Sequence, residues 1–166
     1  MVLVESNIYF ARKNEDVKLP TKREEDGCYD LYAYFEEPSM RIEPHETRLI
    51  PTGIYSAMTP HHRVSLRERS SSTKWGVSIR AGQIDSGFRG EWWVALHNDN
   101  DIPVEISKLV NEVVKTDKLI SYPCEKAICQ FAIEVVPLIK TVEISLEELS
   151  AIPSARGTGD LGSSGK

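Results

Sequence analysis

Asp85 has the clearest setting for catalytic chemistry of any acidic side chain in this sequence. It lies in the stretch "GQIDSGFRG", where Gly82 and Gly87 permit sharp backbone turns on either side of it. We expect Ile84 and Phe88 to anchor this loop in apolar surroundings. The same pattern is also typical of a turn that an aspartate merely stabilises. A chemical role for Asp85 therefore depends on which other groups lie near it.

Two further stretches carry side chains that suit phosphate. In "RERSSSTKWG", Arg69 precedes three serines at the end of a strand-like run, and the glycine-rich tail (residues 153–166) contains Arg156 and further serines. A guanidinium beside hydroxyls and turning backbone N–H groups binds anions, so together these stretches could hold one polyphosphate. Taken separately, they are also typical of a solvated loop and a disordered terminus. The ending "GSSGK" does not match a P-loop, because Asp160 stands at the first glycine position and no Ser or Thr follows Lys166.

The composition excludes several classes of protein. Twenty basic and twenty-five acidic residues give the 166-residue chain a formal charge of −5, so we expect no nucleic-acid partner, and a polyanionic ligand must meet a local group of cations. No apolar run approaches membrane-spanning length and the first residues lack a signal-peptide core, which predicts a cytoplasmic protein without membrane contact. The chain has three cysteines, Cys28, Cys124 and Cys129. An odd number, without the spacing of a zinc site, favours reduced thiols over disulfides.

The candidate site residues must be positioned by the elements around them. Most of the chain consists of short runs of alternating apolar and polar residues or of β-branched residues, separated by Gly, Pro, Asp and Asn. They predict an all-β fold, a sandwich, jelly roll or barrel. The runs are "NIYFAR", "TRLIPTGIYSAM", "RVSLRER", "GVSIRAG", "EWWVALHN", "PVEIS" and "AICQFAIEVVPLI". Two stretches, residues 106–116 and 145–150, are expected to form short helices. The length predicts one domain, residues 1–152, followed by the tail.

The order of five motifs resembles that of the homotrimeric dUTPases, the dUTP diphosphatases. The motifs are "GCYDLYA", "RSSSTKWGV", "AGQIDSGFRGEWWVALHN", "KAICQFAI" and "RGTGDLGSSG", and they span nearly the whole chain. The resemblance implies a distorted β-jelly-roll subunit of a homotrimer, with a flexible C-terminal arm that closes over the site. It also implies hydrolysis of dUTP to dUMP and pyrophosphate, which limits uracil incorporation into DNA, with Mg²⁺ held mainly by the substrate phosphates.

The third motif assigns roles around Asp85. By this resemblance Asp85 holds the attacking water, since in-line attack on the α-phosphorus demands fixed positioning. Phe88 packs under the deoxyribose and leaves no room for a ribose 2′-hydroxyl. The hairpin that contains Gly82, Ile84 and Trp93 reads uracil through backbone groups, and cytosine would leave buried polar groups unpaired.

The first, second and fourth motifs supply the expected phosphate and metal contacts. By resemblance, Arg69, Ser70 and Ser71 contact the phosphates and the bridging oxygen where charge develops. Gln130 is expected near the α-phosphate and the water. Asp30, whose setting is also typical of a plain turn acid, is expected to support the water shell of Mg²⁺ indirectly.

The fifth motif supplies the arm. Arg156, Gly162, Ser163 and Ser164 match residues that grip the γ-phosphate, and the arm is expected to reach the site of a neighbouring subunit. Leu161 stands where the family usually has Phe over the uracil. Apolar cover remains there, but ring stacking worth ~0.5–1.5 kcal/mol is lost.

Three other departures from the family pattern matter. Ala127 replaces a basic residue of the fourth motif, although Lys126 lies next to it, and Phe88 replaces a tyrosine. Residues 107–122 look like an insertion between the third and fourth motifs. This insertion is either a surface excursion or a site for a protein partner or regulator.

Two rival functions remain to be weighed. A dCTP deaminase shares the fold and a similar turn, but it needs a glutamate on the following strand, where Ala95 stands here. A non-catalytic nucleotide-sensing or partner-binding relative would lack Asp85, Ser70 or Arg156, and all three are present. The sequence therefore predicts a dUTP diphosphatase.

Overall fold

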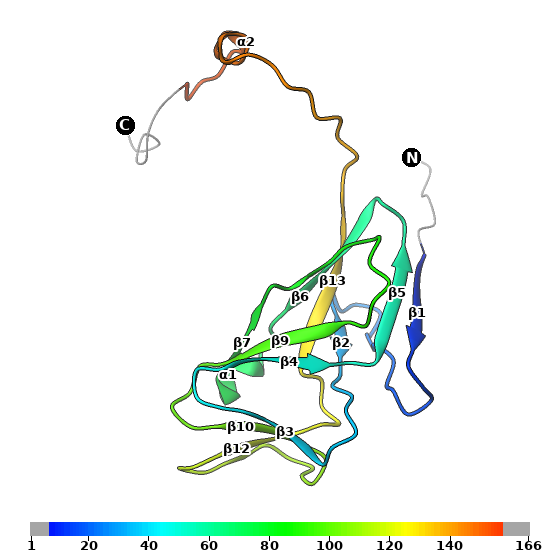
Figure 1. Cartoon of the computed structure of the whole chain (residues 1–166), viewed down its shortest axis with the longest axis vertical. Helices are drawn as coiled ribbons and strands as arrows, with labels where there is room; N and C mark the ends of the chain where they lie inside the picture. The colour runs from blue at the N-terminus through cyan, green and yellow to red at the C-terminus, as the bar shows by residue number, and fades with distance from the viewer. Residues whose placement is uncertain (1–6, 158–166) are drawn as a thin grey trace.

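Short β-strands dominate the computed structural model, which describes residues 7–157 (Figure 1). The strands are β1 (Ile8–Arg12), β2 (Tyr29–Leu31), β3 (Ser39–Ile42), β4 (Thr47–Pro51), β5 (Ile54–Met58), β6 (His62–Arg67), β7 (Val77–Arg80), β8 (Gln83–Ile84), β9 (Trp93–Asn98), β10 (Val104–Ser107), β11 (Val114–Lys115), β12 (Ile120–Pro123) and β13 (Cys129–Val135). The helices are α1 (Ser72–Trp75) and α2 (Leu146–Ala151).

The strands form four small sheets, with orders β1-β5, β11-β12-β10-β3, β2-β13-β6-β8 and β4-β9-β7. Within them β10 and β12 run parallel, whereas the other pairings of described strands are antiparallel. The predicted all-β class is confirmed. Many strands far apart in sequence are neighbours, so side chains from separate motifs can meet at strand ends.

The predicted apolar runs form strands, with one division that the sequence did not reveal. The run at residues 47–58 forms β4 and β5, which belong to different sheets. The chain turns between them at Gly53, whose φ is +67°. A Cβ at Gly53 would lie 2.6 Å from Cγ2 of Val17, so both the conformation and the close contact require glycine.

The expected helix at residues 106–116 is wrong. This stretch contains the end of β10 and the short strand β11, and its residues 111–116 are exposed. A helix there would have no core to cover, while the β-branched valines favour extended backbone. The following strand β12 buries Ile120 and Tyr122, so this part of the expected insertion belongs to the core.

The expected helix at residues 145–150 is confirmed as α2. Its first turn carries a capping box: the Ser145 hydroxyl accepts from the Glu148 backbone N–H, and the Glu148 carboxylate accepts from the Ser145 backbone N–H. These bonds, together with the acidic first turn, stabilise a short helix that buries none of its own residues.

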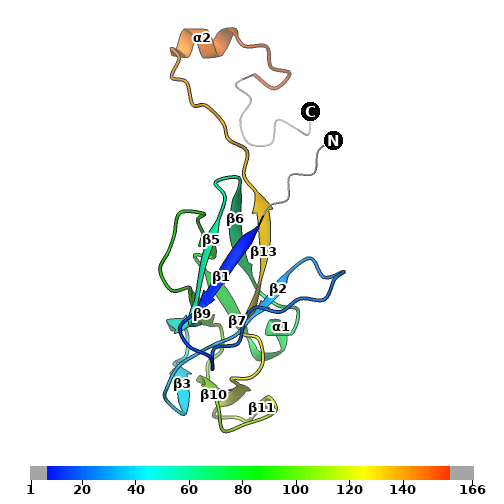
Figure 2. The same ribbon diagram turned by 90° about the vertical axis from the view of Figure 1, so that its right-hand side faces the viewer.

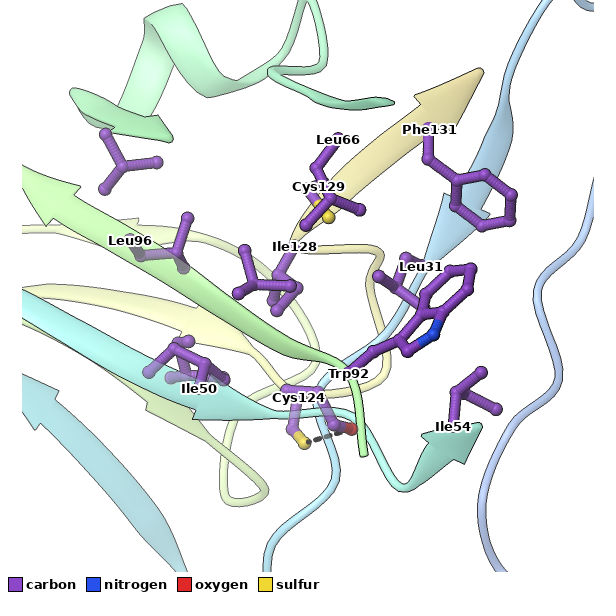
Figure 3. Packing of buried hydrophobic residues seen from close by; sticks show 14 of the residues in the cluster. Leu31, Ile50, Ile54, Leu66, Trp92, Leu96, Cys124, Ile128, Cys129 and Phe131 are labelled. Carbon is purple, nitrogen blue, oxygen red and sulfur yellow. Dashed lines mark hydrogen bonds between the residues drawn. The ribbon is translucent and has the colours of Figure 1, made fainter. Parts of the chain in front are cut away.

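The core lies between the sheets and contains large apolar side chains from most of the strands (Figure 3). Trp92 is fully buried, and its ring meets that of Phe131 edge to face at a centroid distance of 5.3 Å. Trp93, the next residue, is 47% exposed. The two neighbouring tryptophans therefore lie on opposite faces of the chain, one in the core and one outside it, as successive residues of extended backbone do. Cys129 lies in the same core, where burial raises the pKa of its thiol.

Asn98, at the end of β9, is a fully buried polar side chain that joins three segments of backbone. Its Nδ2 donates to the carbonyl oxygens of Ile42, Glu43 and Ile102 at 2.9–3.2 Å. These carbonyls belong to the end of β3 and to the loop before β10, so one side chain holds both beside β9.

Glu134 connects β13 to β6 through charge. Its carboxylate accepts from the guanidinium groups of Arg67 and Arg63, which lie across the strand pair. The hydrogen bond from Arg67 lowers the pKa of Glu134 most, and the hydrogen bond from Arg63 lowers it further.

The segment after β13 projects from the body of strands, and α2 lies well apart from the sheets in both views (Figures 1 and 2). Its apolar side chains are exposed; they are Leu138, Ile139, Val142, Ile144, Leu146, Leu149 and Ile152. None of the helices in residues 7–157 is long and apolar enough to cross a membrane.

Candidate functional site

Three of the five motifs meet in one open cavity of about 710 Å³. Asp30, Arg69, Ser70, Ser71 and Gln130, all predicted site residues, lie in its wall. The remaining lining residues come from one loop that precedes β2; they are Thr21, Lys22, Arg23, Asp26, Gly27 and Cys28. Cations, hydroxyls and an amide therefore surround a space large enough for a polyphosphate.

Strand β13 assembles this cavity. In its register Gln130 lies opposite Asp30 on β2 and opposite Arg67 on β6. Arg69 follows two residues after Arg67, beyond the strand end, where the chain turns into α1. The Gln130 amide donates to the carbonyl of Glu68 at 2.7 Å, which fixes the segment that carries Arg69.

Arg69 and Asp30 form a two-point ion pair inside the cavity. Nε of Arg69 lies 2.9 Å from Oδ1 of Asp30, and Nη2 donates to Oδ2 at 3.3 Å. Nη1 of Arg69 also donates to the carbonyl of Ala127 at 3.2 Å and to the Ser71 hydroxyl at 3.4 Å. The guanidinium is thus held from three sides.

Ala127 contributes its backbone to the site. Its side chain is 3% exposed, and its carbonyl also accepts from the Tyr122 hydroxyl at 2.8 Å. Lys126, the neighbouring residue, lines a second depression of about 500 Å³ together with Arg69 and Ser71. A positive charge therefore remains beside the cavity, although the residue at position 127 is apolar.

Residues 21–26, which precede the first motif, are the part of the cavity that the sequence analysis missed. The Lys22 ammonium donates to the carbonyls of Arg23, Glu24 and Asp26 at 2.7–3.1 Å. The guanidinium of Arg23 donates to both carboxylate oxygens of Asp26 at 2.9 Å, and this bond lowers the pKa of Asp26. The signal in the sequence was the charged run "TKREED" immediately before the first motif.

Asp85 lies in a turn closed by a hydrogen bond from the Phe88 N–H to the Asp85 carbonyl at 3.1 Å. Nε2 of Gln83 donates to Oδ1 of Asp85 at 2.7 Å and orients the exposed carboxylate. Ile84 is buried, as expected, but Phe88 is 43% exposed, so the prediction that Phe88 anchors the loop in apolar surroundings is wrong. The aromatic ring of Phe88 instead covers Gly90, where a Cβ would lie 2.5 Å from it.

Gly82 is required by a close approach of backbones. A Cβ there would lie 2.7 Å from the carbonyl oxygen of Leu66, and the Gly82 carbonyl accepts from the Leu66 N–H at 2.6 Å. At Gly87 nothing lies within 4 Å of such a Cβ. Glycine is therefore needed at position 82 for a close contact and not for a positive φ, whereas Gly87 has free space and no positive φ either.

The Asp85 turn lies apart from the cavity in a single copy of the chain. Ile84 pairs with Val64 on β6, whereas Gln130 pairs with Arg67 on the same strand. Asp85 follows Ile84 in the direction away from Arg67, so it is displaced by about four residues, or about 13 Å, along β6. Asp85, Phe88 and Trp93 are not among the described residues that line the cavity.

The arm residues are only partly described. Arg156 is exposed, and its backbone N–H donates to the Ser154 hydroxyl at 3.3 Å. Leu161, Gly162, Ser163 and Ser164 lie outside the described residues, so their expected contacts with substrate stay predictions.

Comparisons with known proteins identify the family. Residues 4–109 match the family model described as dCTP deaminase-like. The chain is 34% identical over 155 residues to a deoxyuridine 5′-triphosphate nucleotidohydrolase of Methylocella silvestris, covering 90% of this chain and 84% of that protein. It is 30% identical over 167 residues to the protein of the same name from Mycolicibacterium gilvum, covering 96% of each.

A solved structure supports the same fold. The dUTPase of Staphylococcus bacteriophage 80alpha, a G164S mutant with dUpNHpp, superposes with a TM-score of 0.69 at 20% identity, covering 95% of this chain and 98% of that one. The fold and site therefore define a member of the dCTP deaminase-like superfamily. Within it, the chain belongs to the dUTPase family.

Proposed function

We propose that this protein hydrolyses dUTP to dUMP and pyrophosphate by attack of water on the α-phosphorus. Membership of the dUTPase family supports the reaction, and the observation that carries it is the cavity. Arg69, Ser70, Ser71 and Gln130 present one guanidinium, two hydroxyls and one amide to the same space. This donor set stabilises charge on a transferring phosphoryl group without covalent chemistry.

Asp85 is the residue to which we assign the attacking water. Its carboxylate is held by Gln83 at 2.7 Å and stands on a turn between two strands. A fixed carboxylate orients the water in line and accepts its proton as the bond to phosphorus forms. Phe88, in the same turn, has an exposed ring that we assign to the deoxyribose, and the backbone of the hairpin between Gly82 and Trp93 is assigned to uracil.

The dUTPase family typically uses Mg²⁺, and the residues of the cavity fit this ion. Asp30, partly exposed in the wall, offers a carboxylate that can accept from the ion's water shell. Residues 7–157 contain no group of three or more His, Cys, Asp or Glu suited to a metal, and we propose that the substrate phosphates hold the ion. When bound, Mg²⁺ neutralises charge on the phosphate oxygens.

A homotrimer is the assembly we propose. The Asp85 turn and the cavity are separated by about 13 Å along β6, so a second copy would have to bring its turn to the cavity. The exposed apolar side chains of the segment after β13 support the same assembly, since an arm of this kind gains by packing on a neighbour. Residues 156–166 are proposed to close over that neighbour's site.

The direct test is release of pyrophosphate from dUTP, dCTP, dTTP and UTP in parallel with Mg²⁺, with each product checked for loss of an amine. We expect rapid release from dUTP alone. Loss of an amine from dCTP would point to deamination, which the half-buried Ala95 on β9 does not support because it has no acid–base group. Binding of dUTP without release would support the sensing or partner-binding function.

A mixing experiment tests the shared site. Asp85→Asn and Arg69→Ala chains are each expected to be inactive as separate trimers. If each site takes Asp85 from one copy and Arg69 from another, random mixed trimers contain about a quarter intact sites. Mixed trimers without activity would show that both residues act within one chain.

A further inference from the structure

Gln83, which donates to the Asp85 carboxylate, is itself part of a row of polar side chains across three strands. In the register of β8 and β6, Gln83 lies opposite Ser65. Two residues earlier on β6, Arg63 lies opposite Glu134 of β13. Because alternate residues of a strand share one face, Gln83, Arg63 and Glu134 lie on the same side of this sheet.

Arg63 connects Glu134 to Gln83. Its Nε donates to the Glu134 carboxylate at 3.0 Å, and its Nη1 donates to Oε1 of Gln83 at 3.3 Å. The Glu134 side chain is 25% exposed and also accepts from Arg67 at 2.5 Å. The Arg63 guanidinium is therefore anchored on β13 while it contacts the side chain that holds Asp85.

This contact decides which end of the Gln83 amide faces Asp85. A glutamine amide has an oxygen that accepts hydrogen bonds and a nitrogen that donates them, whereas a guanidinium only donates. The amide oxygen must therefore point toward Arg63. The amide nitrogen is then directed to Oδ1 of Asp85, to which it donates at 2.7 Å. In the opposite orientation an oxygen would face the carboxylate and repel it.

Arg89, the cation within the Asp85 turn itself, has a different part. Its Nη1 donates to the carbonyls of Ser86 and Phe88 at 2.7 and 3.0 Å. These bonds stabilise the backbone of the turn, whereas Gln83 contacts the Asp85 carboxylate directly.

We propose that Arg63 and Gln83 are positioning residues for the attacking water, an inference that rests on the proposed function. Glu134 holds Arg63, Arg63 orients the Gln83 amide, and the amide fixes Oδ1 of Asp85. The second carboxylate oxygen, Oδ2, is the one assigned to the water, whose line of attack depends on a carboxylate that does not rotate. These residues belong to one chain, so each copy positions its own Asp85.

The test is steady-state pyrophosphate release from dUTP by Gln83→Leu, Gln83→Glu and Arg63→Met. Leucine cannot donate, so kcat should fall by about 10- to 100-fold, the effect of losing a hydrogen bond to a charged group, while KM stays within about 2-fold. Glutamate keeps the shape of glutamine but presents only acceptors, so its kcat should be at least as low. In Arg63→Met the amide can take either orientation, and kcat should fall by about 2- to 10-fold as the correctly oriented fraction falls.

Arg67→Met is the matched control, because it removes the other arginine from the Glu134 carboxylate and leaves the contact between Arg63 and Gln83. Its kcat should stay within about 2-fold of the wild type, since it lies outside the coupled contacts. A loss equal to that of Arg63→Met would overturn the inference in favour of a general effect of charge on β6. Wild-type kcat in Gln83→Glu would also overturn it, because shape alone would then suffice.

The Asp85→Asn background separates positioning from a structural role. If Gln83 acts through Asp85, adding Gln83→Leu to Asp85→Asn should lower kcat by less than about 2-fold, since residues that act as a unit are not additive. A further loss of about 10-fold would show that Gln83 acts elsewhere and would overturn the inference.

The wild type separates this inference from the proposed function. If the wild type turns over dUTP and any of these contrary results is found, the inference fails and the proposed function stands. If the wild type does not turn over dUTP, both fail.

Discussion

Gly82→Ala is expected to displace the hairpin that carries Asp85. The added Cβ would lie 2.7 Å from the carbonyl oxygen of Leu66, whereas ordinary contact begins near 3.4 Å. The two strands must therefore separate by about 0.7 Å, at a cost of about 1–3 kcal/mol for an overpacked position. Because Asp85 follows three residues later, a displacement approaching 1 Å should lower turnover of dUTP by about 10²-fold.

Gly87→Ala is the matched control, since a Cβ added at Gly87 would meet nothing within 4 Å and its φ is not left-handed. Its free energy of unfolding should be unchanged or raised by up to about 1 kcal/mol, because alanine reduces the entropy of the unfolded chain. Urea denaturation gives both unfolding free energies, and pyrophosphate release gives the turnover of Gly82→Ala. If Gly82→Ala unfolds at the same urea concentration as Gly87→Ala, the steric reasoning is refuted.

Four other changes have defined outcomes. Asp85→Asn should keep the fold and nucleotide binding but lower turnover by about 10²–10⁴-fold; normal turnover would remove Asp85 from the mechanism. Deletion of residues 156–166 should abolish most activity without dissociating the trimer on gel filtration, and full activity would contradict the proposed arm. Asn98→Ala should destabilise the fold by at least about 1–3 kcal/mol in urea, because buried carbonyls lose their donor. Glu134 has a lowered pKa in the folded protein, so its contribution to stability is present above the usual glutamate range and is lost as the pH falls through the folded value. Wild type and Glu134→Gln should therefore differ in unfolding free energy at about pH 7, and the difference should shrink as the pH falls below the usual glutamate range; a constant difference would contradict this.

The local features of the fold were readable from the sequence because they depend on near neighbours. Alternation of apolar residues located most strands and places the adjacent Trp92 and Trp93 on opposite faces, although only the structure shows that Trp92 is the buried one. The Ser145–Glu148 spacing encoded the capping box of α2. The same reasoning failed at residues 106–116, because apolar spacing alone does not say whether a helix has a core to cover.

The motifs themselves, and with them the dUTPase family, were determined by the sequence, because the types and order of chemical groups are properties of the chain. Only the tertiary structure decided which motifs meet. Strand pairing joins Gln130 to Asp30 and to Arg67, and no local pattern encodes a register between such distant residues. The Arg69–Asp30 pair and the part of the cavity formed by residues 21–26 became visible only through that pairing, as did the separation of Asp85 from the cavity. Their positions are set by packing between sheets, which depends on the whole chain at once.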